Sequence, residues 1–230
     1  PDAVIVAAGC YVQAAEKEMA EKNMADILVG NNKKKDIAQI LEEYFAVKEE
    51  EQKVPLVSEV IDINHTKEYE DLTIHKVNEH TRAYIKIQDG CNQFCSYCII
   101  PYTRGRIRSK NPEEVIEEVK NLAAQGYKEI VLTGIHLSSY GKDLGDITLL
   151  DVIQRIQQIE DIERIRLGSL EPRIITEQFV KELRACDKVC PHFHLSLQSG
   201  CDETLKRMNR KYTTEEYETA LNVLRTYYEH

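Results

Sequence analysis

Apolar runs and amphipathic helical patterns alternate from the start of the chain. Buried strands are predicted at 3–7 and 25–30, followed by helices at 14–24 and 36–47. This alternation is typical of the end of a doubly wound α/β domain. The first strand is expected to deliver Cys10 to a loop.

A charged stretch with one proline and scattered β-branched positions follows. Residues 48–80 therefore predict an extended connector with one or two short strands. We expect three parts: 1–47 as the end of an N-terminal domain, 48–80 as the connector, and 81–230 as a second domain.

The remaining chain repeats a strand followed by a helix, four times. The strands are predicted at 83–88, 129–132, 164–167 and 193–197. Asn111 is expected to cap the first helix, and Thr213 with Glu216 to form the capping box of the last. Further helices are predicted at 149–159, 176–185 and 214–228. Repeated β/α units with right-handed crossovers build a parallel sheet or barrel.

Three cysteines within eight residues follow the strand at 83–88. Cys91, Cys95 and Cys98 form a C-x3-C-x2-C run, and no further Cys or His occurs in the next thirty residues. Three soft ligands without a fourth suit a four-iron cluster with one iron open to substrate. A zinc site with a remote fourth ligand, or free buried thiols, remain alternatives. A loop at the C-terminal end of a barrel strand is where active sites of such barrels lie.

With Tyr97 before the third cysteine, this run resembles the signature of the radical S-adenosylmethionine (SAM) superfamily. The segments YIKIQDGCNQFCSYCIIPYTRGRIRS and HLSLQSGCDETLKRMNRKYT are similar to methylthiotransferases that modify a tRNA adenosine or a ribosomal protein. TGIHLSSYG and RGRIRS are most similar to the branch acting on threonylcarbamoyl-adenosine beside the tRNA anticodon. The implied fold is a partial radical SAM β/α barrel preceded by the end of a doubly wound α/β domain.

The resemblance also implies the cofactors. Cys91, Cys95 and Cys98 would hold a 4Fe-4S cluster that binds and reductively cleaves SAM. Cys10, in GCYVQ, matches the last of three ligands of a second 4Fe-4S cluster, whose other cysteines would lie upstream. That cluster would supply sulfur, and a second SAM the methyl group. The chain is therefore expected to be an internal fragment. Alone, Cys10 would be interpreted as a small core residue.

Residues after the predicted strands are expected to line the SAM pocket. They are Tyr97, Thr133, Gly134, Ser169, Glu171, Gln198 and Ser199. As alternatives, Gly134 only turns the chain and Glu171 caps a helix or pairs with an arginine.

Three arginines alternate after the cluster loop. In an extended segment, Arg104, Arg106 and Arg108 would project to one side and could bind RNA phosphates or the SAM carboxylate. The alternative is that they are solvated surface residues. A second basic group is expected at the surface: Arg207, Arg210 and Lys211. Structural roles are favoured for Cys186, Cys190, His192 and His194, and Cys201 is expected near the SAM pocket.

Composition limits where RNA can bind. The 230 residues carry a formal charge of -9, so any RNA site must be local. Seven cysteines, an odd number, favour reduced or metal-bound thiols over disulfides. No apolar run approaches the roughly twenty residues of a membrane helix, so a cytoplasmic protein is expected. The resemblance implies tRNA and a flavodoxin or ferredoxin type reductant as partners.

The competing functions are methylthiolation of a ribosomal protein, a non-catalytic iron–sulfur or zinc module, and a thiol redox protein.

Overall fold

Residues 3–50, 54–72 and 81–228 are described in the computed structural model. They belong to two compact units, one formed by Pro1–Leu72 with Ile99–Arg106 and the other by Thr73–Cys98 with Ile107–His230. Residues 51–53 and 73–80 of the predicted connector lie outside the described part. Among the described helices, none has the length and apolar character needed to cross a bilayer.

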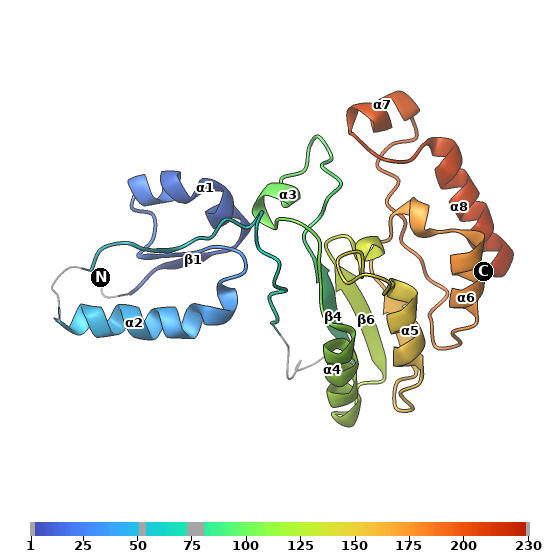
Figure 1. The fold of residues 1–230 in the computed structure, drawn as a ribbon, viewed down its shortest axis with the longest axis horizontal. Coiled ribbons are helices and arrows are strands. Elements are labelled where there is room, and N and C mark those ends of the chain that lie inside the picture. The colour runs from blue at the N-terminus through green and yellow to red at the C-terminus, as the bar shows by residue number, and fades with distance from the viewer. Residues whose placement is uncertain (1–2, 51–53, 73–80, 229–230) are drawn as a thin grey trace. The chain divides into compact units, whose positions relative to one another are not determined.

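The first unit contains a three-stranded parallel sheet. Its strands are β1 (Val6–Ala8), β2 (Ile27–Val29) and β3 (Val57–Glu59), in the order β1-β2-β3. Helices α1 (Cys10–Glu21) and α2 (Ile37–Glu50) cover opposite faces of this sheet (Figure 1). The unit is thus a small α/β layer structure with helices on both sides.

The middle strand β2 supplies both hydrophobic layers of this unit. Successive side chains of a strand point to opposite faces. Ile27 and Val29 therefore pack with Ile40 of α2, while Leu28 packs with Val12 of α1. All three strand residues are fully buried.

The beginning of α1 differs from the prediction. The helix begins at Cys10 and not at residue 14, so Cys10 lies in the first helical turn and not in a loop. Gly9 precedes the helix with φ 113°, a conformation that favours glycine and allows the chain to turn directly from β1 into α1. The predicted connector contains a short strand, as expected: β3 pairs with β2, completes the sheet and belongs to the first unit.

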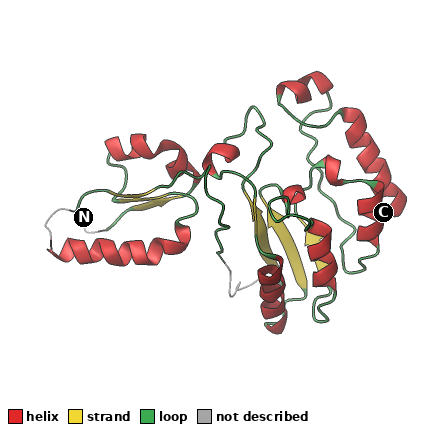
Figure 2. Cartoon of the chain, viewed as in Figure 1, coloured by secondary structure: helices red, strands yellow, loops and turns green. Residues whose placement is uncertain are grey.

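The second unit contains a four-stranded sheet in the order β5-β4-β6-β7. β4 (Arg82–Asp89), β6 (Glu129–Gly134) and β7 (Arg164–Leu167) are parallel, as predicted, and β5 (Arg108–Ser109) pairs antiparallel with β4. Figure 2 shows these strands with the helices that follow them. The C-terminal ends of the three parallel strands, β4, β6 and β7, lie along one edge of the sheet.

The predicted strand at 193–197 is wrong. This segment makes only an isolated parallel bridge between Leu195 and Leu170, and Gln198 adopts a positive φ of 67°. Alternating apolar residues predict a strand here, but Leu195 is the only buried residue of the segment. The second unit is therefore an open, partial barrel.

The predicted helices of this unit are confirmed with small shifts at their ends. They are α4 (Pro112–Ala124), α5 (Leu149–Gln157), α6 (Glu177–Arg184) and α8 (Thr214–Tyr227). Asn111 accepts a hydrogen bond from Glu113 N, and Thr213 with Glu216 forms a capping box. Short elements that the sequence did not predict also occur: η1 (Lys34–Asp36), α3 (Ile100–Thr103), η2 (Leu137–Ser139), η3 (Pro172–Ile174) and α7 (Asp202–Arg207).

Candidate functional site

The three cysteines lie on the loop that leaves the C-terminal end of β4. Gly90 and Phe94 have φ values of 70° and 52°, so two left-handed residues fold the loop back on itself. Cys91 and Cys95 are buried, with 8% and 9% of their surface exposed, and Cys98 is half-buried. The amide of Cys98 donates to Cys95 O over 2.9 Å. The loop thus gathers three thiols at the edge of the sheet.

Gln88 fixes the start of this loop. Its Nε2 donates to Asp89 O (2.7 Å) and Gly90 O (2.8 Å), and its Oε1 accepts from His136 N (2.6 Å). The side chain is fully buried. A Cβ on Gly134 would lie 2.9 Å from Gln88 Cβ, so glycine at this position allows the close approach of Gln88. Sequence reasoning assigned Gly134 to the SAM pocket and did not find Gln88.

The segment after α7 contacts three successive residues of the cysteine loop. Ser96 N donates to Met208 O (3.0 Å), and Asn209 Nδ2 donates to Phe94 O (2.7 Å). Arg210 Nη1 donates to Cys95 Sγ over 3.3 Å.

The surface position predicted for Arg210 is therefore wrong. Its guanidinium is partly buried, whereas Arg207 and Lys211 are exposed as predicted. No local sequence pattern could signal this contact, because it joins residues 115 positions apart.

The thiols influence one another electrostatically. Burial raises the pKa of Cys91, and the neighbouring Cys95 and Cys98 raise it further. A bound cation would reverse this effect and hold the thiols as thiolates. The arrangement is therefore suited to a positively charged inorganic group.

The donor set of three thiols fits an iron–sulfur cluster, whose cysteines each bind a different iron. Among the described residues, no group of three or more His, Cys, Asp or Glu side chains is placed to hold a single metal ion. Arg210 Nε is also buried without an acceptor among the described residues, and so is available to a group held by this loop.

The predicted SAM residues are only partly brought together. Tyr97 Oη donates to Gln198 Oε1 over 3.1 Å, which joins the cysteine loop to the segment before α7. Ser169 Oγ lies 2.7 Å from His194 Nδ1, and Ser199 Oγ accepts from Cys201 N.

Thr133 and Glu171 have other local partners. Thr133 Oγ1 donates to Ile85 O within the sheet (3.1 Å), and the amide of Glu171 donates to Ser138 Oγ (2.9 Å). Burial raises the pKa of the Glu171 carboxyl. The carboxyl of Glu171 is half-buried at this edge, where it can hydrogen-bond a polar ligand.

His136 was not predicted as a site residue, yet it follows β6 at the same edge. Its Nδ1 lies 2.7 Å from Ser139 Oγ, and Nε2 is buried without a hydrogen-bond partner in the described part. Burial, with the charges of Lys142 and Arg210, lowers its pKa to about 4. The imidazole is therefore neutral at pH 7.

The three alternating arginines do not form one extended row. Arg104 caps the C-terminal end of α3, Arg106 is exposed, and Arg108 lies in β5 with 1% of its surface exposed. Of the three, Arg106 is exposed, Arg104 is half-buried and Arg108 is buried.

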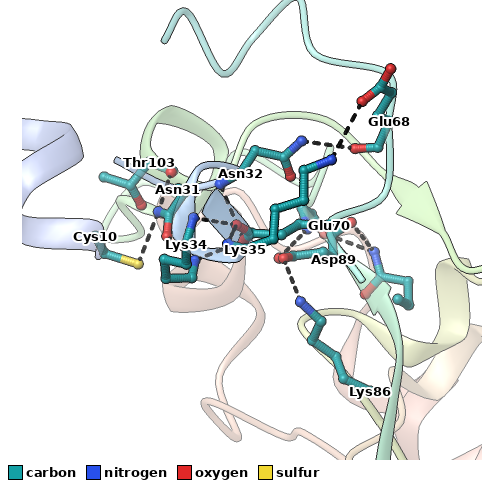
Figure 3. A network of polar contacts seen from close by, with 12 residues as sticks. Cys10, Asn31, Asn32, Lys34, Lys35, Glu68, Glu70, Lys86, Asp89 and Thr103 are labelled. Atoms are coloured by element: carbon teal, nitrogen blue, oxygen red, sulfur yellow. Dashed lines mark hydrogen bonds and ion pairs between the residues drawn. The ribbon is translucent and has the colours of Figure 1, made fainter. Parts of the chain in front are cut away.

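Cys10 lies in a polar network of the first unit (Figure 3). Asn31 Nδ2 donates to Cys10 Sγ (3.4 Å) and to Thr103 O (2.6 Å), while Asn31 Oδ1 accepts from Lys34 Nζ (2.9 Å). Burial raises the pKa of Cys10, but the Asn31 hydrogen bond and the Arg104 charge outweigh this effect, so that the pKa is lowered. Cys10 is thus a partly accessible thiol held in a cation-rich setting.

The remaining cysteines and histidines considered in the sequence analysis lie outside the cysteine loop. Cys186 and Cys190 are buried, His194 contacts Ser169, and His192 and Cys201 are exposed.

Residues 85–229, which include the cysteine loop and the whole edge described above, match the model of the Radical SAM superfamily. This chain belongs to that superfamily. The fold class predicted from the sequence is thereby confirmed, and the superfamily is one that uses SAM and an iron–sulfur cluster.

Among curated relatives, the chain is 40% identical over 97% of its length to "Threonylcarbamoyladenosine tRNA methylthiotransferase MtaB" of Aquifex aeolicus, covering 53% of that protein. It is 40% identical to the protein of the same name from Bacillus subtilis, over 98% of the chain and 49% of the relative. It is 38% identical to "tRNA-2-methylthio-N(6)-dimethylallyladenosine synthase" of Thermoanaerobacter sp., over 98% and 47%. The predicted resemblance to methylthiotransferases is confirmed, and the chain spans about half the length of these relatives.

Solved structures agree on the fold. The cobalamin-dependent S-adenosylmethionine radical enzyme OxsB matches 97% of this chain and 35% of its own, with TM-score 0.64 and 14% identity. The radical S-adenosylmethionine methyltransferase TsrM from Kitasatospora setae, described with a bound 4Fe-4S cluster, matches 63% of this chain and 28% of its own, with TM-score 0.51 and 22% identity.

Proposed function

We propose that this chain is part of a methylthiotransferase that acts on threonylcarbamoyl-adenosine beside the anticodon of tRNA. The observation that supports this most directly is the 40% identity to two proteins of that name, which extends over both units. The three-thiol loop at the C-terminal end of β4 also supports the proposal, because it would hold the cluster that such a reaction needs.

Cys91, Cys95 and Cys98 would hold a 4Fe-4S cluster. Such a cluster, when bound with SAM and reduced, supplies the 5′-deoxyadenosyl radical that activates an adenine C–H bond. Gln88 orients the loop, and the Tyr97 to Gln198 hydrogen bond ties its exposed side to a neighbouring segment. This positioning and the exclusion of water are the protein's part in radical chemistry.

Further residues at the strand ends are proposed to contact SAM. They lie at or after the C-terminal ends of β4, β6, β7 and the Leu195 bridge: Tyr97, Thr133, Gly134, Ser169, Glu171, Gln198 and Ser199. Glu171 is proposed to hydrogen-bond a ribose, because its carboxyl is half-buried at this edge and can accept from two hydroxyl groups.

Cys10 is proposed as one ligand of a second 4Fe-4S cluster, completed by cysteines of a longer protein. Its lowered pKa favours the thiolate that a metal ligand requires. That cluster would donate sulfur, and a second SAM the methyl group. The proposed partners are tRNA, contacted by Arg106, and a flavodoxin or ferredoxin type reductant in the cytoplasm.

Anaerobic reconstitution with iron and sulfide tests the site. We expect an electron paramagnetic resonance signal of a reduced four-iron cluster that changes when SAM is added. Cys95→Ala should abolish the signal, and Cys186→Ala, a buried thiol away from the loop, should retain it. Zinc uptake, or a signal indifferent to SAM, would support a non-catalytic metal-binding module instead.

Binding of RNA separates the tRNA and ribosomal-protein branches. An anticodon stem-loop that carries threonylcarbamoyl-adenosine should bind the protein more tightly than the same stem-loop with unmodified adenosine. Equal affinity for both RNAs would contradict threonylcarbamoyl-adenosine as the substrate. Preferential binding of a ribosomal protein would favour the branch that modifies such a protein.

A further inference from the structure

We infer that Arg210 is a positioning residue for the cysteine loop and that its charge raises the reduction potential of the cluster held there. This inference rests on the proposed function, because it requires a 4Fe-4S cluster on Cys91, Cys95 and Cys98. It assigns a role to a basic side chain that sequence patterns place at the surface.

The contacts of the segment 208–210 support a positioning role of Arg210 for the cysteine loop. Met208, Asn209 and Arg210 contact Ser96, Phe94 and Cys95, so three successive residues bind three successive residues of the loop. Asn209 itself adopts a left-handed φ of 56°, which directs the chain from the end of α7 toward the loop. The contact is therefore a built junction between two distant segments.

The guanidinium is held from more than one side. Its Cζ lies 5.0 Å from the centre of the Tyr212 ring, a cation–π distance, and Tyr212 Oη donates to Ser196 O (2.6 Å) and to Leu197 O. Leu205, whose carbonyl accepts from Arg210 N over 2.9 Å, is buried under the same segment. Arg210 can therefore keep its place when a cluster is present.

The positive charge of Arg210 supports its proposed effect on the reduction potential of the cluster. Arg210 Nη1 lies 3.3 Å from Cys95 Sγ, and Nε is buried without an acceptor in the described part of the chain. Reduction adds one electron to the cluster and its thiolates, while no bond to the protein breaks. A fixed positive charge in a partly buried setting stabilises the more negative state, and hydrogen bonds to cluster sulfurs act in the same direction. Removing this charge must therefore make reduction harder.

The test is a reductive titration with dithionite of the reconstituted protein, followed by electron paramagnetic resonance. We expect Arg210→Gln to shift the midpoint potential to a more negative value. Arg207→Gln is the matched control, since it removes the same charge three residues away, from an exposed side chain that donates to Thr204. It should leave the potential unchanged.

The outcomes distinguish the two proposals. If the wild-type protein forms no cluster that responds to SAM, the proposed function fails before any variant is compared. If it forms one and both variants have the same potential, the inference about Arg210 is overturned. Thermal melting followed by circular dichroism shows whether each variant is folded.

A second variant covers the case in which Arg210→Gln does not fold or holds no cluster. Arg210→Lys keeps the charge but loses the planar fork that contacts Cys95. We expect its cluster to be lost to a chelator several-fold faster than the cluster of Arg207→Lys. Equal rates of loss would contradict the positioning role.

Discussion

At the scale of single residues, the contact between Gly134 and Gln88 links the sheet to the cysteine loop. Gln88 lies near the end of β4 in the interior, and its amide bonds to the two residues that precede Cys91. Gly134 leaves space for that amide, since any side chain there would approach the Gln88 side chain closely. Glycine at position 134 of β6 therefore helps Gln88 to orient the cysteine loop that follows the neighbouring strand β4.

Replacing Gly134 by alanine should disturb this loop. The new Cβ would lie 2.9 Å from Gln88 Cβ and 3.0 Å from its Oε1, which forces Gln88 to move. We expect a loss of about 1–3 kcal/mol in the free energy of unfolding, as for other overpacked core sites. Urea denaturation and the iron content after reconstitution measure the two effects.

Gly200→Ala provides the matched control for this change. A Cβ added to Gly200 would meet no described heavy atom within 4 Å, and the backbone there does not have a positive φ. This variant should keep the wild-type stability and iron content. A Gly134→Ala protein with wild-type iron content would show that Gln88 does not orient the loop.

Both the nitrogen and the oxygen of the Asn31 side-chain amide form hydrogen bonds. Asn31→Ala would leave Thr103 O and Lys34 Nζ without this partner and free the Cys10 thiol from its contact. Asn31 is only 3% exposed, so we expect a loss of about 1–3 kcal/mol in stability. Asn64→Ala, an exposed asparagine of the same unit, should change the urea midpoint little. Equal midpoints for both variants would contradict the structural role of Asn31.

Local patterns of the sequence predict more of the site than distant contacts do. The C-x3-C-x2-C run predicts three ligands because their spacing is local, and the structure brings the three cysteines together on one loop. Arg210 was missed because its partner lies 115 residues away, and neither residue changes the local pattern. The predicted row of arginines is not extended for another reason: Arg104 still has the helical backbone of the α3 cap and Gly105 adopts a positive φ of 68°, so alternate residues do not share a face.

At the scale of elements, caps and buried runs determined what could be predicted. Asn111 and Thr213 bond to amides two or three residues ahead, so a short stretch of sequence contains the whole signal. The beginning of α1 depends instead on the backbone of Gly9, and its side-chain pattern gives no cap. The segment at 193–197 has a strand-like pattern, but a strand also needs a paired neighbour, and within this described segment only Leu195 has one.

A carboxylate joins three strands at the opposite end of the sheet from the cysteines. Glu129, at the start of β6, pairs with Arg82 of β4 (3.5 Å) and with Arg164 (2.9 Å) and Arg166 (3.0 Å) of β7. The Arg164 hydrogen bond lowers the pKa of Glu129, and it outweighs the opposing effect of burial. The ion pairs thus contribute to the stability of the sheet when Glu129 is ionised.

The stability gained from Glu129 should depend on pH. Because its pKa is lower in the folded state than the ordinary value of 4.5, the contribution is complete above that value and is lost as pH falls through the folded pKa. Glu129→Gln should cost about 1.5–3 kcal/mol at pH 7 and progressively less below pH 4.5. Urea unfolding at pH 7 and pH 3 measures the difference. Glu160→Gln, at an exposed position, should show no such dependence, and a constant cost for Glu129→Gln would exclude this pairing as its cause.

At the scale of the whole molecule, charge opposes the proposed substrate. A formal charge of -9 repels RNA in general, so binding must depend on a few local cations. Arg108 is buried in β5, and Arg104 caps a helix in the first unit, which leaves Arg106 as the exposed member of the three. The affinity of the chain for an anticodon stem-loop should therefore be modest and decrease with salt.

Arg106→Gln should weaken binding of the stem-loop and reduce its dependence on salt. Each phosphate contact that is lost lowers the slope of log K against log salt by about 0.7 to 1 for single- or double-stranded nucleic acid. Fluorescence anisotropy with a labelled stem-loop between about 50 and 200 mM salt measures this slope. Arg225→Gln, which removes an exposed charge from α8, is the control and should keep the wild-type slope. If both variants have the same slope, long-range charge and not a contact by Arg106 governs RNA binding. A lower slope for Arg106→Gln alone would locate an RNA contact eight residues after Cys98, the last thiol of the proposed cluster site.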